Sequence, residues 1–110
     1  MGWLGNRGKQ RPGTLRAANS ADQDHLLAFV KDKTGVEAYL EPRTTVTDTT
    51  VVLVAASGEW TRRRVESESA AQSFARKHAI PIYDAGRVGY PQRMREWTAR
   101  QKAAGEAGAT

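Results

Sequence analysis

Cysteine is absent from this 110-residue sequence, and histidine occurs only twice. Without cysteine the chain cannot form disulfides, use a thiol nucleophile, hold an iron–sulfur cluster or bind zinc through thiolates. Two isolated histidines, His25 and His78, do not make a metal site, and we expect both to serve as capping, packing or solvated side chains. The sequence therefore predicts no bound cofactor.

Large apolar residues are also scarce. Hydrophobic residues make up 39% of the chain and aromatic residues 7%, which suits one modest core in a domain of ordinary length. No stretch approaches the ~18 apolar residues of a membrane-spanning helix, and the first residues lack the apolar run of a secretory signal. We expect a cytoplasmic protein that makes no membrane contact, whose oligomeric state the sequence leaves open.

Acidic residues are missing from the first 21 positions, which contain four basic ones. Residues 22–85 hold eight basic and ten acidic residues, and residues 86–110 hold five basic and two acidic ones. The net charge of +5 is therefore concentrated at the two ends of the chain. Such an excess suits an anionic partner, because clustered cations attract phosphate polymers and acidic surfaces.

Composition divides the chain into three parts. Residues 1–13 contain four glycines and one proline, so ordering them is costly and we expect a flexible basic N-terminal arm. Residues 103–110 have no large apolar side chain, which predicts a disordered tail. Residues 14–102 remain as a single domain.

Periodicity within that domain predicts an α+β fold with helices on one or both faces of a sheet, in the order α-β-β-β-α-β-α. A capping box at Ser20 predicts a first helix over 20–34, Ser67 caps a second, and Pro91 opens a third. The strands are expected at 36–41, 50–55, 60–65 and 80–83. The second and third should form an antiparallel hairpin at the centre of the sheet, whereas Pro81 confines the fourth to an edge.

The first candidate binding surface is a run of one tryptophan and three arginines, namely Trp60, Arg62, Arg63 and Arg64. Period 2 along a strand places Trp60, Arg62 and Arg64 on one face, where they could stack on bases and neutralise phosphates. Alternatively, Trp60 packs under a helix, and the arginines pair with strand carboxylates such as Glu37 and Glu41.

The second candidate surface lies near the C-terminus and includes Arg87, Tyr90, Arg93, Arg95 and Trp97. Cations at the start of a helix oppose its dipole, so another group should hold these arginines. A carboxylate such as Asp84 or Glu41 could anchor them and dock the helix through Met94 and Trp97. Alternatively, they face an anionic partner, since tryptophan and arginine are enriched at binding hot spots.

No catalytic arrangement stands out from the sequence. The serines occupy predicted turns, caps and helices, without the Gly-x-Ser-x-Gly elbow of a hydrolase. The glycine pairs at 5–8 and 86–89 do not match a dinucleotide-binding fingerprint or a phosphate loop. We therefore assign no catalytic residue.

Several short motifs resemble a family of small uncharacterised actinobacterial proteins; they lie at residues 12–16, 35–37, 41–45, 58–63 and 88–95. The resemblance covers about residues 12–98 and implies no catalytic residue. Proteins of this family are loosely associated with the label oxidoreductase, which would imply a cofactor-linked accessory role. The residues themselves provide no redox group for that role.

The sequence favours a non-catalytic cytoplasmic binding module that contacts RNA, DNA or an acidic protein through its arginine and tryptophan surfaces. A protein-interaction or oligomer subunit using residues 88–97 is the first alternative. A cofactor-linked oxidoreductase accessory is the second.

Overall fold

The computed structural model describes residues 20–109, including the side chains of residues 20–105. The chain runs α2 (Ser20–Asp32), β2 (Glu37–Glu41), β3 (Thr50–Val54), β4 (Trp60–Arg64), α3 (Glu68–Lys77), β5 (Ile82–Asp84), α4 (Ala85–Val88) and α5 (Gln92–Ala109). This confirms the α+β class and the predicted element order, to which the structure adds the short helix α4. The predicted arm at 1–13 lies outside the described residues.

The four strands form one mixed sheet in the order β4-β3-β2-β5. The strands β2, β3 and β4 are antiparallel neighbours, whereas β5 runs parallel to β2. Because β5 begins after Pro81, its position at a sheet edge agrees with the prediction from that proline. The hairpin β3–β4 is present, but only β3 is central, and β4 forms the other edge of the sheet rather than lying at its centre.

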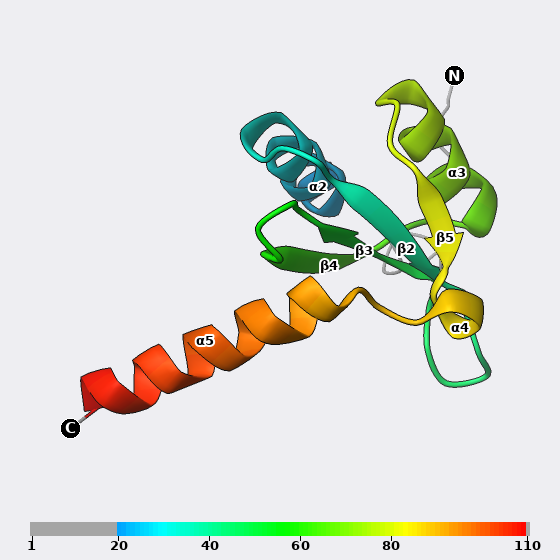
Figure 1. The fold of residues 1–110 in the computed structure, drawn as a ribbon. Coiled ribbons are helices and arrows are strands. Elements are labelled where there is room, and N and C mark those ends of the chain that lie inside the picture. Colours follow the sequence, from blue (N-terminus) through cyan, green and yellow to red (C-terminus); the bar gives the residue numbers. More distant parts are fainter. Residues whose placement is uncertain (1–19, 110) are drawn as a thin grey trace, which may run out of the picture.

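One face of the sheet is covered by α2 and α3 (Figure 1). The Ser67 hydroxyl caps α3 by accepting a hydrogen bond of 3.0 Å from the Ala70 N–H, as its sequence position predicts. The small side chains of Ala71 and Ala75 allow α3 to lie close to the sheet, and Leu26 and Phe29 of α2 complete this core with inward residues of β2 and β3. Burial of these apolar groups is the main stabilising contribution of this layer.

The opposite face is covered only in part, by α4 and the first turns of α5. Buried Ala85 and Met94 pack there on Tyr39, Val52 and Val54. Beyond these turns α5 leaves the body of the protein and extends outward (Figure 1), and residues 98–105 are all exposed. Among residues 20–109, no element covers the part of this sheet face towards the ends of β2 and β4.

Helix α5 continues to Ala109, although the sequence predicted a disordered tail from residue 103. Alanine has the highest intrinsic helix propensity, and four of the seven residues from 103 to 109 are alanines. Because residues 98–105 are exposed, the helix in that stretch is supported by intrinsic propensity rather than by tertiary packing. Among the described residues, no helix has the length and apolar character needed to cross a membrane.

Candidate functional site

The sheet register places Trp60, Arg62 and Arg64 on one face, as the period-2 pattern predicted. Arg62 lies opposite Val52, which in turn lies opposite Tyr39, so these three residues form one row across the strands. The next row contains Arg64, Thr50 and Glu41. The two arginines therefore share the partly open face with a glutamate of β2.

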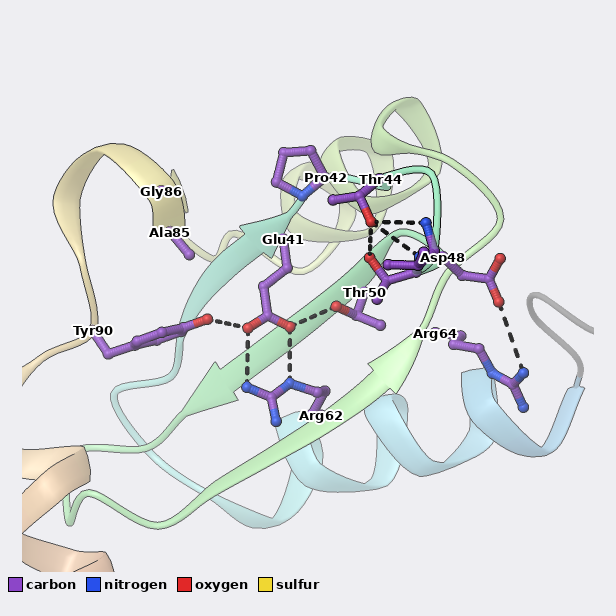
Figure 2. Close-up of a pocket in the computed structure, with 12 residues that line it drawn as sticks. Glu41, Pro42, Thr44, Asp48, Thr50, Arg62, Arg64, Ala85, Gly86 and Tyr90 are labelled. Atoms are coloured by element: carbon purple, nitrogen blue, oxygen red, sulfur yellow. Dashed lines mark hydrogen bonds and ion pairs between the residues drawn. The ribbon is translucent and has the colours of Figure 1, made fainter.

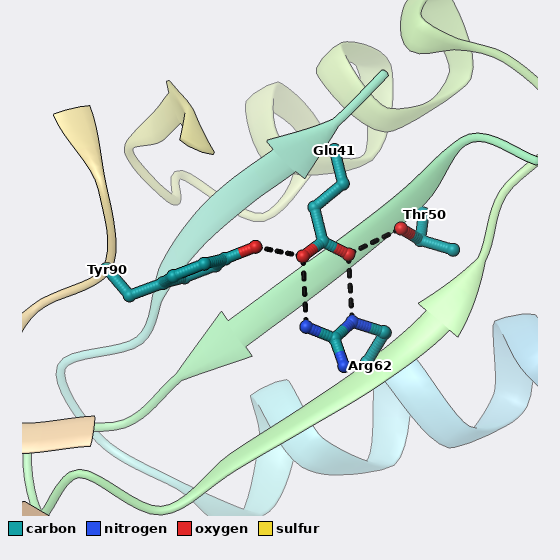
Figure 3. Close-up of polar contacts among 4 residues, drawn as sticks. All are labelled: Glu41, Thr50, Arg62 and Tyr90. Atoms are coloured by element: carbon teal, nitrogen blue, oxygen red, sulfur yellow. Dashed lines mark hydrogen bonds and ion pairs between the residues drawn. The ribbon is translucent and has the colours of Figure 1, made fainter. Parts of the chain in front are cut away.

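Glu41 connects the two candidate surfaces (Figure 3). The guanidinium of Arg62 donates to both carboxylate oxygens, from Nε at 2.8 Å and from Nη2 at 3.0 Å. Thr50 donates from Oγ1 at 2.5 Å, and the Tyr90 hydroxyl donates to the other oxygen. Both Glu41 oxygens thus accept two hydrogen bonds, which leaves the carboxylate no vacant position as a base or ligand.

The protonation of this group follows from its contacts. Burial alone would raise the pKa of Glu41, but the hydrogen bonds from Arg62, Thr50 and Tyr90 favour the charged form and lower it below its ordinary value. Burial and the contact with Glu41 raise the pKa of Tyr90. Glu41 is therefore a charged carboxylate and Tyr90 a neutral donor near pH 7.

Trp60 is not an open platform for base stacking. Its half-buried ring packs with the second core, and its Nε1 donates to Thr98 Oγ1 of α5 at 2.8 Å. The Arg62 Cζ atom lies 5.5 Å from the centre of the ring, within the range of a cation–π contact. For Trp60 and Arg62 the structure thus agrees with the alternative interpretation of the sequence. The tryptophan packs under a helix, and the arginine pairs with Glu41.

Arg63 and Arg64 are held more loosely than Arg62. Arg63 points to the other face, where its Nε lies 3.9 Å from Asp22 and its Nη2 lies 3.3 Å from His25 Nδ1. The Nη1 of Arg64 lies 3.9 Å from Asp48. Both ion pairs lie at the distance limit. The Arg64–Asp48 pair joins two half-exposed side chains and leaves Arg64 available for other anions, whereas Arg63 lies beside the largely buried Asp22.

Arg93 fixes the start of α5 on the sheet. Its Nη2 contacts Glu37 at 2.8 Å and its Nε donates to the Ala55 carbonyl at 2.9 Å. The hydrogen bond from Arg93 favours the carboxylate and lowers the pKa of Glu37. An anchoring carboxylate was predicted from the sequence, but Glu37 fulfils this role for Arg93, whereas Asp84 caps α4 by accepting from the Gly86 N–H.

The other residues of the C-terminal cluster have separate positions. Arg95 donates to the Tyr90 carbonyl at 3.0 Å, and half-buried Trp97 packs beside the turn at Gly58. Arg87 is exposed on α4 and has no ion-pair partner among the described residues. The structure therefore does not unite this cluster with Arg62–Arg64 in one patch; only Tyr90 joins them, through Glu41.

An open pocket of about 750 Å³ lies on the uncovered part of the sheet face (Figure 2). It runs from the β4 arginines past Glu41 to α4, and its remaining wall is the loop between β2 and β3. The residues that line it are Glu41, Pro42, Thr44, Val46, Thr47, Asp48, Thr50, Arg62, Arg64, Ala85, Gly86 and Tyr90. The threonines were not among the predicted site residues; the run of threonines between residues 44 and 50 is the only signal that could have indicated a hydroxyl-lined wall.

The two histidines have structural contacts. His25 Nε2 lies 2.6 Å from Thr61 Oγ1 and joins α2 to β4, and the His78 ring lies 4.7 Å from that of Phe74. Within residues 20–109 no group of three potential metal-ligating side chains is present.

Comparison with known proteins identified no relationship: no protein-family model matches the chain, and no curated protein or solved structure is significantly similar to it.

Proposed function

We propose that this protein is a non-catalytic, cytoplasmic binding module that holds a polyanionic partner against the arginines of β4. The observation that supports this proposal is the exposure of three consecutive arginines on an edge strand. The side chains of Arg62, Arg63 and Arg64 are 44%, 42% and 47% exposed. Among the described residues, no other strand of the sheet carries a basic residue.

The three arginines have different roles in this proposal. Arg62 is fixed by both oxygens of Glu41, whose negative charge offsets its own, so this pair holds the middle of β4 in place. Arg64 has only an ion pair of 3.9 Å with the half-exposed Asp48, which another anion can displace at little cost. Arg63 is 42% exposed but lies beside the largely buried Asp22 and beside His25, so it adds positive charge without exchanging its partner. The contact surface is therefore the β4 edge, with Arg64 as its exchangeable cation and Arg63 as an exposed positive charge beside it.

Binding rather than catalysis is supported by the state of the central carboxylate. Glu41 is the most enclosed acidic group of the pocket face, and all of its hydrogen-bonding positions are occupied by its neighbours. Its pKa is lowered, which is opposite to the tuning required of a general acid or base near pH 7. The group is suited to hold the surface in place.

Fluorescence anisotropy with labelled RNA, single-stranded DNA and polyglutamate tests this function at about 50 mM salt and above. The double variant Arg63→Gln/Arg64→Gln should lower the affinity for the bound polymer by about tenfold and reduce its salt dependence. The matched control Arg76→Gln/Lys77→Gln removes the same charge from exposed positions of α3 and should change the affinity far less.

Two outcomes would contradict the proposal. One is the absence of salt-dependent binding to all three polymers. The other is an equal loss in both double variants, because this would show that net charge alone, and not the β4 edge, sets the affinity.

A protein-interaction subunit is the second candidate function, and one observation favours it. Val88 is 60% exposed and Tyr83 39% exposed, close to a small hollow lined by both residues together with Tyr39 and Tyr90. Most of the predicted contact helix is used within the fold, since Met94 is buried and Arg93 is paired with Glu37. If light scattering shows a dimer, Val88→Ser should dissociate it; a monomer at all concentrations excludes self-association through this surface.

A further inference from the structure

Among residues 20–109, no strand pairs with the outer edge of β4, which presents a regular set of backbone groups. The Ala55 N–H donates to the Glu59 carbonyl at 2.8 Å and the Val65 N–H donates to the Thr49 carbonyl at 3.0 Å. Since hydrogen-bonded residues alternate along an antiparallel pair, the odd-numbered residues of β4 bond to β3. The N–H and C=O groups of Trp60, Arg62 and Arg64 therefore point away from the sheet.

The same residues have their side chains on the pocket face. Successive residues of this set are about 6.6–6.8 Å apart along a strand. Within the described part of the chain, the edge thus combines a ladder of donors and acceptors that no other strand pairs with and positive side chains at the same repeat. A nucleic acid has no peptide backbone to pair with these donors and acceptors. The Trp60 ring, which could have stacked on bases, instead contacts Thr98 and Arg62.

Charge determines which strand can add to this edge. A second copy of β4 would place arginines against arginines, and like charges on neighbouring strands repel each other. An acidic strand instead brings carboxylates to Arg62 and Arg64, and can replace the Asp48 carboxylate that lies 3.9 Å from Arg64. On the other face, Asp22 of α2 beside Arg63 disfavours a further acidic residue.

We propose that the partner is an extended acidic peptide segment, which adds to β4 as a fifth strand and carries acidic residues at alternate positions. This inference rests on the proposed function and specifies the class of polyanion. Binding by strand addition derives affinity from main-chain hydrogen bonds and specificity from alternate side chains. Here the acidic side chains face the pocket, and the residues between them face α2.

Amide hydrogen exchange measured by NMR tests the proposal on the unmodified protein. The probe is a short acetylated and amidated peptide that alternates threonine with glutamate. On binding, exchange at Arg62 and Arg64 should slow by about tenfold or more, whereas Thr61 and Arg63 already donate to β3 and should change little. Contact through side chains alone would leave the exchange rates of the Arg62 and Arg64 amides unchanged.

Backbone methylation of the peptide supplies the matched control. Only every second N–H of an added strand faces β4. Methylating the set that faces β4 should abolish binding, and methylating the other set should leave it nearly intact. Equal affinities for the two methylated peptides, or unaltered exchange at Arg62 and Arg64 in a saturated complex, would refute strand addition.

The outcomes separate this inference from the proposed function. If polyglutamate or an oligonucleotide binds through Arg63 and Arg64 but strand addition is refuted, the binding function stands and the inference is wrong. If only nucleic acid binds, the partner is a nucleic acid and the inference is again wrong. If none of the polymers and peptides binds, the proposed function itself is overturned.

Discussion

The hydroxyl of Tyr90 donates a hydrogen bond to the carboxylate of Glu41, which stands 49 positions earlier in the chain and also binds Arg62. One side chain of β2 therefore holds both the connection between α4 and α5 and the middle of β4. Because Arg62 is positioned by the same carboxylate that accepts from Tyr90, docking of the C-terminal segment and presentation of the β4 arginines are structurally linked.

Tyr90→Phe tests this link by removing one hydrogen bond while keeping the ring. We expect the free energy of unfolding to fall by about 1–2 kcal/mol, because a part-buried carboxylate loses a donor. Denaturation by urea measures the change. Tyr83→Phe is the control, since the Tyr83 hydroxyl has no hydrogen-bond partner among the described residues; an equal loss in both variants would show that the contact with Glu41 contributes nothing specific.

Gly58→Ala should displace the start of α5. Gly58 has a φ of +97°, and a Cβ atom there would overlap the Arg93 carbonyl and lie 2.9 Å from the Trp97 Cβ. We expect a loss of about 1–3 kcal/mol in unfolding free energy from overpacking, in addition to the backbone strain. Tryptophan fluorescence during denaturation reports the change.

The comparison for this variant is Gly89→Ala. Gly89 also has a positive φ, +71°, but a Cβ atom there would have no neighbour within 4 Å. It should therefore show only the backbone strain, about 1–3 kcal/mol, because φ +71° with ψ −176° is a conformation almost confined to glycine. If the two variants lose the same stability, the close approach of α5 to the β3–β4 turn is not what constrains Gly58.

The sequence predicted local features of this fold better than their spatial relations. The cap at Ser67, the apolar run of β3 and the edge position after Pro81 follow from short-range rules of backbone geometry and hydrogen bonding. The placement of β4 at an edge depends on β2 pairing with β3 and β5, which are contacts between distant parts of the chain. Periodicity contains no information about strand order.

The same distinction applies to the candidate site. The alternation that groups Arg62 with Arg64 could be read from the sequence, as could Glu41 as a possible partner of a β4 arginine. Two other contacts could not be read from the sequence: Tyr90 also reaches Glu41, and Glu37 rather than Asp84 holds Arg93. The residues of these pairs are 49 and 56 positions apart in the chain. Such pairings are set only once the helices dock on the sheet.

Acid should weaken docking of the C-terminal segment. The contact with Arg93 lowers the pKa of Glu37, and the hydrogen bonds from Arg62, Thr50 and Tyr90 outweigh burial and lower that of Glu41. Groups with a depressed folded pKa stabilise the protein above their unfolded pKa, near 4.5, and this stability is lost as the pH falls through the folded values. Urea midpoints should therefore decline below about pH 4.5.

The double variant Glu37→Gln/Glu41→Gln is the control for the acid effect. It cannot ionise at these positions, so its stability at neutral pH should be lower and its decline in acid shallower than in the unmodified protein. Parallel curves for the two proteins would assign the acid sensitivity to other carboxylates.

Alkali should reveal Tyr39 as a late-titrating phenol. Burial, followed by the hydrogen bond that its hydroxyl donates to Glu37, raises the pKa of Tyr39 from 10.0 to about 12. A raised folded pKa means that the folded protein retains a proton which the unfolded chain releases. The stabilisation is therefore complete below pH 10 and is lost as the pH rises to about 12.

Ultraviolet absorbance of tyrosinate follows this titration, and the chain has only three tyrosines. In the folded protein Tyr39 should ionise near pH 12, and Tyr39→Phe should remove its share of the late rise in absorbance. Tyr90→Phe separates the contribution of Tyr90, whose pKa is also raised. Glu37→Gln should keep the ionisation of Tyr39 but move it to lower pH, because a neutral acceptor no longer opposes the phenolate. If Tyr39→Phe leaves the late rise unchanged, a different tyrosine is responsible for it, and the loss of stability between pH 10 and about 12 cannot be assigned to Tyr39.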